Sequence, residues 1–387
     1  MAKPPCVLFL LDWKPAFWST REEYFRRMSC ALAAQGITPI LTVSEEVEPR
    51  VRARLESAGT QLIACPYAGR YRRYLRHIGG IAARYSVELA QVRFFDYFSL
   101  VPWLCRSQGI RRIVFTESNG GEWQRGGMKA WLVRQRTVAT CGPLTFAIGI
   151  SRFIRDRLES IGIPSRKLRV VYNGIDTDAF LPDPAQRALL AEELGMPVET
   201  RFVVFASALL DSKRPEMAID AISRLPQGSR PVQLLIAGEG PKRRELEELA
   251  AQRRAPVRFL GYYPAPQRLL QASDLFLHTT LGEAFGNVLA EAAACGVPVV
   301  GSLSGGAPEV VDDGRTGLLV KPGEGEAKRL AAAMARLLND EPLRSEFGRA
   351  GIDRARRLFG IDRSVAETLE VYREATSGRI APAGTSH

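Results

Sequence analysis

The passage Glu283-Ala284-Phe285-Gly286-Asn287-Val288-Leu289-Ala290-Glu291, continued by Ala292-Ala293-Ala294-Cys295-Gly296-Val297-Pro298-Val299-Val300, decides the fold. It follows an apolar run that ends at His278 and leads into another apolar run. This order predicts a strand, a loop, a helix and a second strand. The loop over 281–286 and the helix N-terminus then lie at the carboxyl edge of a parallel sheet, where such sheets bind ligands.

The two carboxylates of this passage are spaced for a ligand. Glu283 lies in the loop, and Glu291 lies eight residues on, which we place about two turns up the helix. Carboxylates accept hydrogen bonds from the paired hydroxyls of sugar and ribose rings. The free N–H groups of a helix N-terminus attract an anion such as a diphosphate, and Gly286 lets it come close. An isolated pair at this spacing would be read as two surface caps, but here the surrounding passage favours a ligand site.

Short apolar runs alternate with amphipathic stretches through both halves of the chain, which predicts two α/β domains. At 387 residues the chain is too long for one core. We expect domains over residues 1–180 and 181–360, then a C-terminal helix within 361–387 that crosses back to the first domain, and a flexible tail. The expected strands are 7–11, 38–43, 61–65, 90–93, 112–116, 146–150 and 168–172 in the first half, and 202–205, 232–237, 257–260, 275–278, 297–301 and 317–320 in the second.

The cysteine usage and the short apolar runs predict a cytoplasmic protein. The first apolar run has only six residues and no run approaches the length of a membrane span, so we expect neither a signal peptide nor a transmembrane helix. The six cysteines are scattered without metal-like spacing, which is typical of reduced core residues. The three histidines form no metal set by spacing.

The positive charge belongs to the first half of the chain. Through Pro182 the net charge is +12, and over the remainder it is −1. Between residues 70 and 85 five arginines alternate with tyrosines. Such a segment suits an anionic membrane, whose inner face the protein would then meet, or a lipid-diphosphate acceptor, and an ordinary solvated basic face fits equally well. Nucleic acid is not expected as a partner, because no nucleic-acid motif accompanies the charge.

The deciding passage resembles the family-4 retaining glycosyltransferases, whose motif reads approximately E-G-F-G-x-x-x-x-E-A-M-A-C-G-x-P-V. The resemblance continues through residues 305–320 and includes Gly238-Glu239-Gly240-Pro241, Phe259-Leu260-Gly261 and the joint Asn173-Gly174-Ile175-Asp176. It implies the GT-B architecture, an α/β fold in which two Rossmann-like domains face each other across a cleft. The first domain would bind the acceptor and the second the nucleotide sugar.

The resemblance also assigns roles to residues. Glu283 would contact the transferred sugar, Glu291 the ribose, and Lys213 would neutralise the leaving diphosphate, the task of a metal in other glycosyltransferases. No metal or other cofactor is therefore expected; the nucleotide sugar is a co-substrate. The remaining contacts to the donor are expected from Phe285, Gly286, Asn287, Gly238, Gly240, Arg214 and Leu260.

Two departures from the family pattern stand out. Ala208 occupies the position of a diphosphate-binding arginine, for which the adjacent Arg214 is the candidate substitute, and Asp12 to Ser19 replace the usual Gly-Gly loop, with Lys14 offering a charge. In the first domain Ser118 stands where the family often has a histidine, and we expect Glu117 and Ser118 near the reacting sugar. A loop turn is the alternative for these two residues.

We therefore expect a retaining, metal-independent glycosyltransferase that moves a sugar onto a glycan or glycolipid in bacterial surface polysaccharide biosynthesis. Two alternatives stay open. One is a nucleotide-sugar epimerase or a phosphorylase of related architecture. The other is a non-catalytic homologue that binds sugar nucleotides or acts as a scaffold, which the loss of arginine at Ala208 suggests.

Overall fold

The computed structural model describes residues 3–11, 13, 19–43, 47–65, 71–95, 99–119, 127–226, 228, 230–377 and 380. The chain forms two compact units. Unit 1 comprises the described residues of Met1–Asn119, Trp123–Gly174 and Ile361–His387, and unit 2 those of Ile175–Gly360. Lys14 and most of the expected tail after residue 377 lie outside the described residues.

Unit 1 is built on a parallel sheet that, in the described part of the chain, has seven strands in the order β3-β2-β1-β4-β5-β6-β7. Buried β-branched and other apolar residues form most of the inner strands, as covered parallel sheets require, whereas the edge strand β3 is only partly covered. The strands confirm the seven predicted in the first half. Their bounds are β1 Pro5–Leu11, β2 Thr38–Val43, β3 Gln61–Ala64, β4 Ser86–Arg93, β5 Ile113–Glu117, β6 Phe146–Gly149 and β7 Leu168–Val170.

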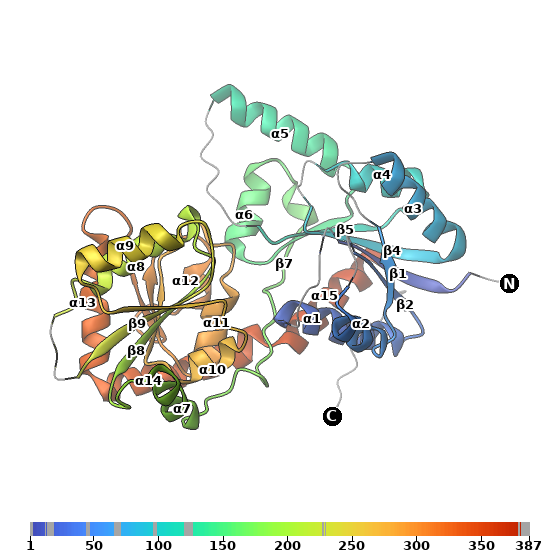
Figure 1. Ribbon diagram of the computed structural model, residues 1–387. Coiled ribbons are helices and arrows are strands. Elements are labelled where there is room, and N and C mark those ends of the chain that lie inside the picture. The colour runs from blue at the N-terminus through green and yellow to red at the C-terminus, as the bar shows by residue number, and fades with distance from the viewer. Residues whose placement is uncertain are drawn as a thin grey trace. The chain divides into compact units, whose positions relative to one another are not determined.

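Helices cover both faces of this sheet (Figure 1). Helices α1, α2 and α15 contribute to one core, and α3 and α4 pack against β4 on the unit's other side. The helices of unit 1 are α1 Thr20–Ala33, α2 Pro49–Glu56, α3 Tyr71–Arg84, α4 Val101–Ser107, α5 Gly127–Cys141, α6 Arg152–Ser160, the 3₁₀ turn η1 Ser165–Lys167, and α15 Ile361–Thr376.

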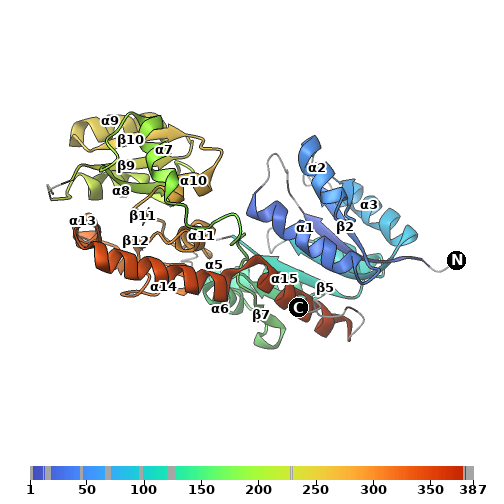
Figure 2. The same ribbon diagram turned by 90° about the horizontal axis from the view of Figure 1, so that it is seen from below.

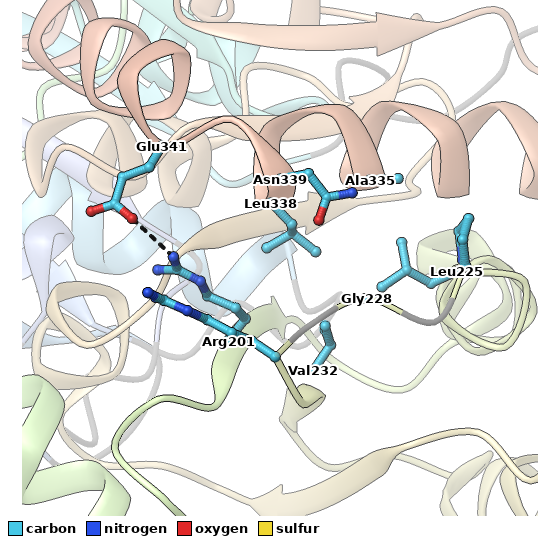
Figure 3. Close-up of a pocket in the computed structure, with 10 residues that line it drawn as sticks. Arg201, Leu225, Gly228, Val232, Ala335, Leu338, Asn339 and Glu341 are labelled. Carbon is cyan, nitrogen blue, oxygen red and sulfur yellow. Dashed lines mark hydrogen bonds and ion pairs between the residues drawn. The ribbon is translucent and has the colours of Figure 1, made fainter.

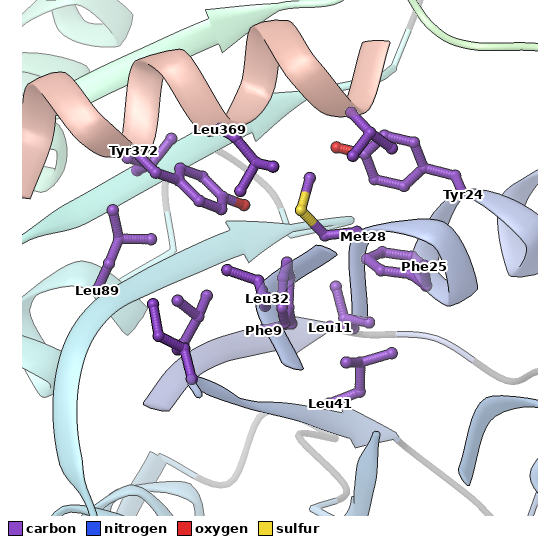
Figure 4. Close-up of a cluster of buried hydrophobic side chains, with 14 of the residues drawn as sticks. Phe9, Leu11, Tyr24, Phe25, Met28, Leu32, Leu41, Leu89, Leu369 and Tyr372 are labelled. Atoms are coloured by element: carbon purple, nitrogen blue, oxygen red, sulfur yellow. The ribbon is translucent and has the colours of Figure 1, made fainter. Parts of the chain in front are cut away.

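The last helix, α15, belongs to unit 1 although it follows unit 2 in the sequence. It lies alongside α1, β4 and β5 in both views of the ribbon (Figure 2). Its Leu369 and Tyr372 point toward Met28 of α1 in the buried core (Figure 4). The Tyr372 hydroxyl also donates to Gln91 Oε1 over 2.6 Å, so this buried polar group has a partner.

Unit 2 repeats the plan with a parallel sheet of six strands among the described residues, in the order β10-β9-β8-β11-β12-β13. These are the six strands predicted in the second half. Two all-parallel sheets confirm the predicted α/β class with two Rossmann-like domains. The bounds are β8 Arg201–Ala206, β9 Val232–Ala237, β10 Val257–Gly261, β11 Leu275–His278, β12 Val299–Ser302 and β13 Gly317–Val320.

The helices of unit 2 cover both faces of its sheet as well. Helices α8, α9 and α13 share one hydrophobic core, and α10 and α11 pack against β8, β11 and β12. The helices are α7 Ala185–Leu194, η2 Asp211–Lys213, α8 Pro215–Ile222, α9 Arg243–Arg253, α10 Pro266–Gln271, α11 Asn287–Ala294, α12 Ala307–Val310, α13 Glu326–Asn339 and α14 Glu341–Phe359.

Candidate functional site

The loop between β11 and α11 is fixed by a glycine-rich turn that follows β12. The Gly306 N–H donates to the Glu283 carbonyl over 2.7 Å, and the Gly282 N–H donates to Ser304 Oγ over 2.9 Å. A Cβ added to Gly305 would lie 2.4 Å from the Glu283 carbonyl oxygen, so the two backbones approach as closely as only glycine allows. The position of Glu283 is therefore set by backbone contacts on both sides.

Glu283 contacts Lys213, which is distant from it in the sequence. Lys213 Nζ lies 2.9 Å from Glu283 Oε2, and His278 Nε2 lies 3.6 Å from the same oxygen. Lys213 comes from the turn after β8, whereas His278 ends β11. Because neighbouring parallel strands end at one edge of the sheet, the three side chains gather there.

The neighbours of Glu283 keep it ionised. Burial raises the pKa of its carboxyl, but the hydrogen bond from His278 and the positive charge and hydrogen bond of Lys213 lower it further, to about 2. The carboxylate is thus negative at every pH at which a protein normally works. It can only accept hydrogen bonds, and sugar hydroxyls can donate them.

The turn that carries Lys213 is anchored behind the site. Arg214 adopts a left-handed backbone with φ of 52°, and its guanidinium bonds Glu326 through Nη1 at 3.1 Å and Nη2 at 2.7 Å. The Glu326 side chain is fully buried and also accepts from Ser302 Oγ over 2.5 Å. Thr279 Oγ1 lies 2.9 Å from the Lys213 carbonyl and 2.8 Å from that of Arg214. Arg214, predicted as a donor contact, is thus engaged by Glu326.

Gly238 and Gly240 lie where the end of β9 crosses the segment after β8. A Cβ on Gly238, which has φ of 146°, would lie 1.9 Å from the Ser207 carbonyl oxygen, and one on Gly240 would lie 2.5 Å from the Leu209 carbonyl oxygen. No side chain fits at either place, so backbone lines this part of the edge. Leu260, near the end of the edge strand β10, is half-buried beside it.

The remaining residues predicted to contact the nucleotide-sugar donor lie on α11 or directly before it. Gly286 precedes the helix with φ of 91°, Asn287 is the exposed first residue, and the Phe285 ring is buried 5.3 Å from the ring of Phe359. Phe285 therefore offers a ligand only its backbone. Glu291 is half-buried and lies four residues after the first residue of α11, a little more than one turn, because Ala284, Phe285 and Gly286 still belong to the loop. Our estimate of two turns is wrong in this respect.

Glu117 and Ser118, the two site residues predicted for the first domain, belong to unit 1, whereas the other predicted site residues belong to unit 2. Glu117 ends β5 and is buried, and its Oε1 accepts from the Asn119 N–H over 2.6 Å. Ser118 Oγ accepts from Arg93 Nε over 3.2 Å. The Gly-Gly-Glu segment that follows in the sequence lies outside the described residues.

A separate cavity of about 230 Å³ lies in unit 2, where β8 and β9 begin (Figure 3). Arg201 and Glu341 form an ion pair of 3.1 Å in its wall. Because ligands of parallel sheets bind at the opposite, carboxyl edge, this cavity is not the predicted site. Its lining comprises Arg201, Leu225, Pro226, Gly228, Arg230, Val232, Ala335, Leu338, Asn339 and Glu341.

Sequence reasoning missed the supports of the site. Thr279, Ser302 and Glu326 were not singled out, although the first two end or follow strands at the ligand-binding edge. His278, which ends β11, was given no role at the site either, and its Nδ1 is buried without a hydrogen-bond partner. Polar residues at strand ends were the signal available for these residues.

Among the described residues, no three Cys, His, Asp or Glu side chains gather as a metal-binding group. None of the described helices combines the length and apolar character needed to cross a membrane.

The fold and this edge define the GT-B class of glycosyltransferases, and comparison with known proteins agrees. The model of Glycosyltransferase Family 4 matches residues 22–179, and that of Glycosyl transferases group 1 matches residues 186–354. The chain belongs to this glycosyltransferase family. Among solved structures, HepE from Anabaena in complex with UDP and glucose has a TM-score of 0.79 at 20% identity, covering 96% of this chain and 100% of that one.

Sucrose-phosphate synthase from Thermosynechococcus elongatus has a similar fold, with a TM-score of 0.78 at 21% identity, covering 96% of this chain and 99% of that one. The D-inositol 3-phosphate glycosyltransferase of Xylanimonas cellulosilytica is 36% identical over 58% of this chain and 56% of that protein. A GDP-mannose-dependent alpha-(1-6)-phosphatidylinositol monomannoside mannosyltransferase of Mycolicibacterium smegmatis is 34% identical over 64% of this chain and 66% of that protein. The chain thus spans between about half and two thirds of these relatives.

We predict that Arg214→Met destabilises the protein by about 3–5 kcal/mol at pH 7, because it leaves the buried Glu326 carboxylate unpaired. Burial raises the pKa of Glu326, but hydrogen bonds from Arg214, Ser302 and the Gly323 N–H lower it below its ordinary value. A lowered folded pKa stabilises above the unfolded pKa, and this stabilisation is lost as pH falls through the folded pKa. The deficit of the variant should therefore shrink below about pH 4.

Urea unfolding at pH 7 and at pH 3.5 measures this difference. Arg244→Met is the control, because the Arg244 side chain is 90% exposed on α9 of the same unit. A deficit below about 0.5 kcal/mol, the usual size of a surface change, or one that is equal at both pH values, would show that the pair does not anchor the turn.

Proposed function

We propose that this protein transfers a hexose from a nucleotide diphosphate sugar to a glycan or glycolipid acceptor, with retention of configuration and without a metal ion. The observation that carries the proposal is the contact between Lys213 and Glu283 at the carboxyl edge of the sheet in unit 2. It brings a cation for the leaving group beside a carboxylate that can accept hydrogen bonds from sugar hydroxyls. Two relatives support the reaction class: one is named a D-inositol 3-phosphate glycosyltransferase, and the other a phosphatidylinositol monomannoside mannosyltransferase.

The Lys213–Glu283 contact would be exchanged when the donor binds. The Lys213 side chain is 29% exposed and the Glu283 side chain 17% exposed, so solvent screens the attraction between their charges only in part. An incoming diphosphate carries more negative charge than one carboxylate, and it would draw Lys213 toward the bridging and departing oxygens. Glu283 Oε2 would then be free to accept a hydrogen bond from a sugar hydroxyl.

Other groups would hold the rest of the donor. Backbone N–H groups around Phe285, Gly286 and Asn287 point from a helix N-terminus, which favours an anion. Glu291, farther along the same helix, would accept hydrogen bonds from the ribose. The backbone at Gly238 and Gly240, and the half-buried Leu260, would flank the nucleotide, and Arg214 would add its charge only if its bond to Glu326 were relaxed.

Retention follows if departure and attack share one face of the sugar. The bond from the anomeric carbon to the diphosphate oxygen breaks, and its electron pair stays with the diphosphate, where Lys213 stabilises it. The acceptor hydroxyl then bonds to the same carbon from the same side and gives its proton to the departing phosphate oxygen. No side chain is assigned as a covalent nucleophile.

We assign the acceptor to residues 1–180, where Glu117 and Ser118 would lie near the reacting sugar, and the donor to residues 181–360. The segment 361–387 would then serve the acceptor domain, since α15 packs in its core. Assembly of bacterial surface polysaccharide or glycolipid in the cytoplasm is the role we propose. The alternative remains a non-catalytic homologue, because Ala208 is an exposed alanine where the family has a cation.

Helix α3 is the surface that we propose meets an anionic membrane. Its Tyr74, Ile78 and Ile81 are buried, and its arginines are exposed on the opposite side. Arg73, Arg76 and His77 line an open hollow of about 240 Å³. Arg70, also part of the predicted basic segment, lies outside the described residues.

The nucleotide-sugar donor should raise the melting temperature of the protein. At a donor concentration of a hundred times its dissociation constant, binding adds about 2.7 kcal/mol to the free energy of unfolding. A thermal-shift panel of UDP-, GDP- and ADP-sugars identifies the nucleotide.

Glu291→Gln should weaken binding of that donor about ten- to a hundredfold, because a charged hydrogen-bond acceptor is lost. Glu245→Gln, at an exposed position on α9, should bind as the wild type does. Equal affinity in Glu291→Gln would remove the ribose assignment.

Glu283→Gln and Lys213→Met should each lower kcat for transfer or donor hydrolysis about 10²- to 10³-fold, since each removes a charge placed at the reacting groups. Stopped product assays on the donor identified above measure this effect, again against Glu245→Gln. Donor binding without any turnover in the wild type would favour the non-catalytic alternative. Wild-type kinetics in both variants would refute the site.

Replacing Arg73 and Arg76 by glutamine should weaken binding to vesicles that contain an anionic phospholipid by about thirtyfold, given about 1 kcal/mol per arginine near such a surface. Co-sedimentation with vesicles of phosphatidylglycerol and phosphatidylcholine measures the effect. Arg244→Gln is the control in unit 2. Binding that is indifferent to lipid charge or to these substitutions would leave α3 as a solvated basic face.

A further inference from the structure

Two arginines and one aromatic ring meet at the carboxyl edge of the sheet in unit 1. The strand β4 ends at Arg93, Phe94 follows it, and Arg21 is the second residue of α1. The guanidinium carbon of Arg21 lies 4.8 Å from the centroid of the Phe94 ring, and that of Arg93 lies 5.2 Å from it. Arg93 also lies 5.4 Å from the ring of Tyr24. We call Arg21, Phe94 and Arg93 the arginine–phenylalanine cluster.

No carboxylate among the described residues forms an ion pair with this cluster. Arg93 is 9% exposed, and its guanidinium donates to two neutral oxygens, Ser118 Oγ at 3.2 Å and Asn173 Oδ1 at 3.1 Å. Within the described part of the chain, neither Arg93 nor Arg21 has an ion pair. Removing a charge from water without a counter-charge costs several kcal/mol, so the fold tolerates an unfavourable arrangement here.

Another buried arginine shows what a purely structural role looks like in this chain. Arg344 of unit 2 is 8% exposed, and its guanidinium has Asp274 at 3.7 Å and Glu341 at 3.8 Å. Its carbonyl partners, Leu337 and Leu338, complete the set. Arg93 lacks the carboxylates and instead has a second cation nearby. Burial lowers the pKa of Arg93, and Arg21 lowers it further, which is the electrostatic mark of that proximity.

The backbone at the cluster is strained, and the strain lies at the point where ligands bind. Phe94 has φ of 65°, a conformation that costs a non-glycine residue of this size a kilocalorie or more. In the strand order of unit 1, β1 separates β2 from β4, and the chain direction of the crossovers reverses between β1 and β4. Such a switch point opens a crevice outside the carboxyl ends of its strands, and α1 follows β1 into it.

We propose that the arginine–phenylalanine cluster binds an anionic group, a phosphate or carboxylate, of the acceptor. That the anion belongs to an acceptor rests on the proposed function, whereas the binding of an anion at this cluster does not. Arg21 is exposed and makes the direct contact, because a guanidinium matches an oxyanion with two parallel hydrogen bonds. Arg93 supplies the buried, uncompensated charge beneath it, and Phe94 holds the two guanidiniums at the edge.

The anion is tested first with inorganic phosphate and with succinate on the purified full chain. The diphosphate site of unit 2 is removed by working in the Lys213→Met background, and affinity is measured by calorimetry and by thermal shift. Arg21→Gln should lower the affinity for the anion at least tenfold, and Arg111→Gln, an exposed arginine of the same unit, should leave it unchanged. Arg93→Gln should act in the same direction, and because Arg21 is exposed its variant keeps the test valid if Arg93→Gln fails to fold.

The source of the anion is tested next, with the donor identified above and two kinds of acceptor. A soluble sugar or cyclitol phosphate represents a small acceptor, and vesicles with phosphatidylinositol represent a lipid headgroup. With the acceptor that is used, Arg21→Gln should raise KM about ten- to a hundredfold, whereas a neutral acceptor should show no such change. Anion affinity or acceptor KM equal to wild type in Arg21→Gln would overturn the inference. Absence of donor turnover in the unmodified protein would instead contradict the proposed function, and leave the anion titration to be judged alone.

Discussion

The ion pair between Arg214 and Glu326 is the interaction on which the geometry of the donor edge depends. It joins residues 112 positions apart and ties the turn after β8 to the start of α13. Arg214 has a left-handed backbone, which is uncommon for a residue with a side chain, and its bidentate bond to a buried carboxylate holds it there. The residue before it, Lys213, is presented toward Glu283 as a result. A rigid pair behind the edge thus positions an adaptable pair at its surface.

The two ion pairs differ in what it costs to break them. Glu326 has no exposed side-chain surface, so loss of Arg214 would leave a charge that neither water nor another cation can reach. Lys213 and Glu283 keep 29% and 17% of their side chains exposed, and either can find water or a ligand when the other moves away. The first pair therefore behaves as structure, and the second as a contact that a stronger anion can replace.

The sequence predicted the strands and the ligand-binding edge because their signals are local. Apolar runs marked every strand of both sheets, and the spacing of Glu283 and Glu291 marked the loop and α11. Contacts between distant segments gave no such signal: nothing in the sequence pairs Arg214 with Glu326, or Arg21 with Arg93. The spacing from Glu283 to Glu291 also overstated the distance along the helix, because the loop residues before Asn287 add no helical rise, so Glu291 lies about one turn into α11 and not two.

The alanine at position 208 gains a physical meaning from these contacts. Arg214 could replace the missing arginine only by leaving Glu326, and the energy of a stranded buried carboxylate opposes that move. The donor edge of unit 2 then has Lys213 and the dipoles of N–H groups to set against a diphosphate. In the proposed reaction, with one cation fewer, stabilisation of the leaving group would depend more strongly on how fully Glu283 releases Lys213. The imidazole Nε2 of His278 lies 3.6 Å from Glu283 Oε2 and can interact with the carboxylate when Lys213 moves away. In the proposed reaction, such an interaction would favour the state in which Lys213 contacts the diphosphate.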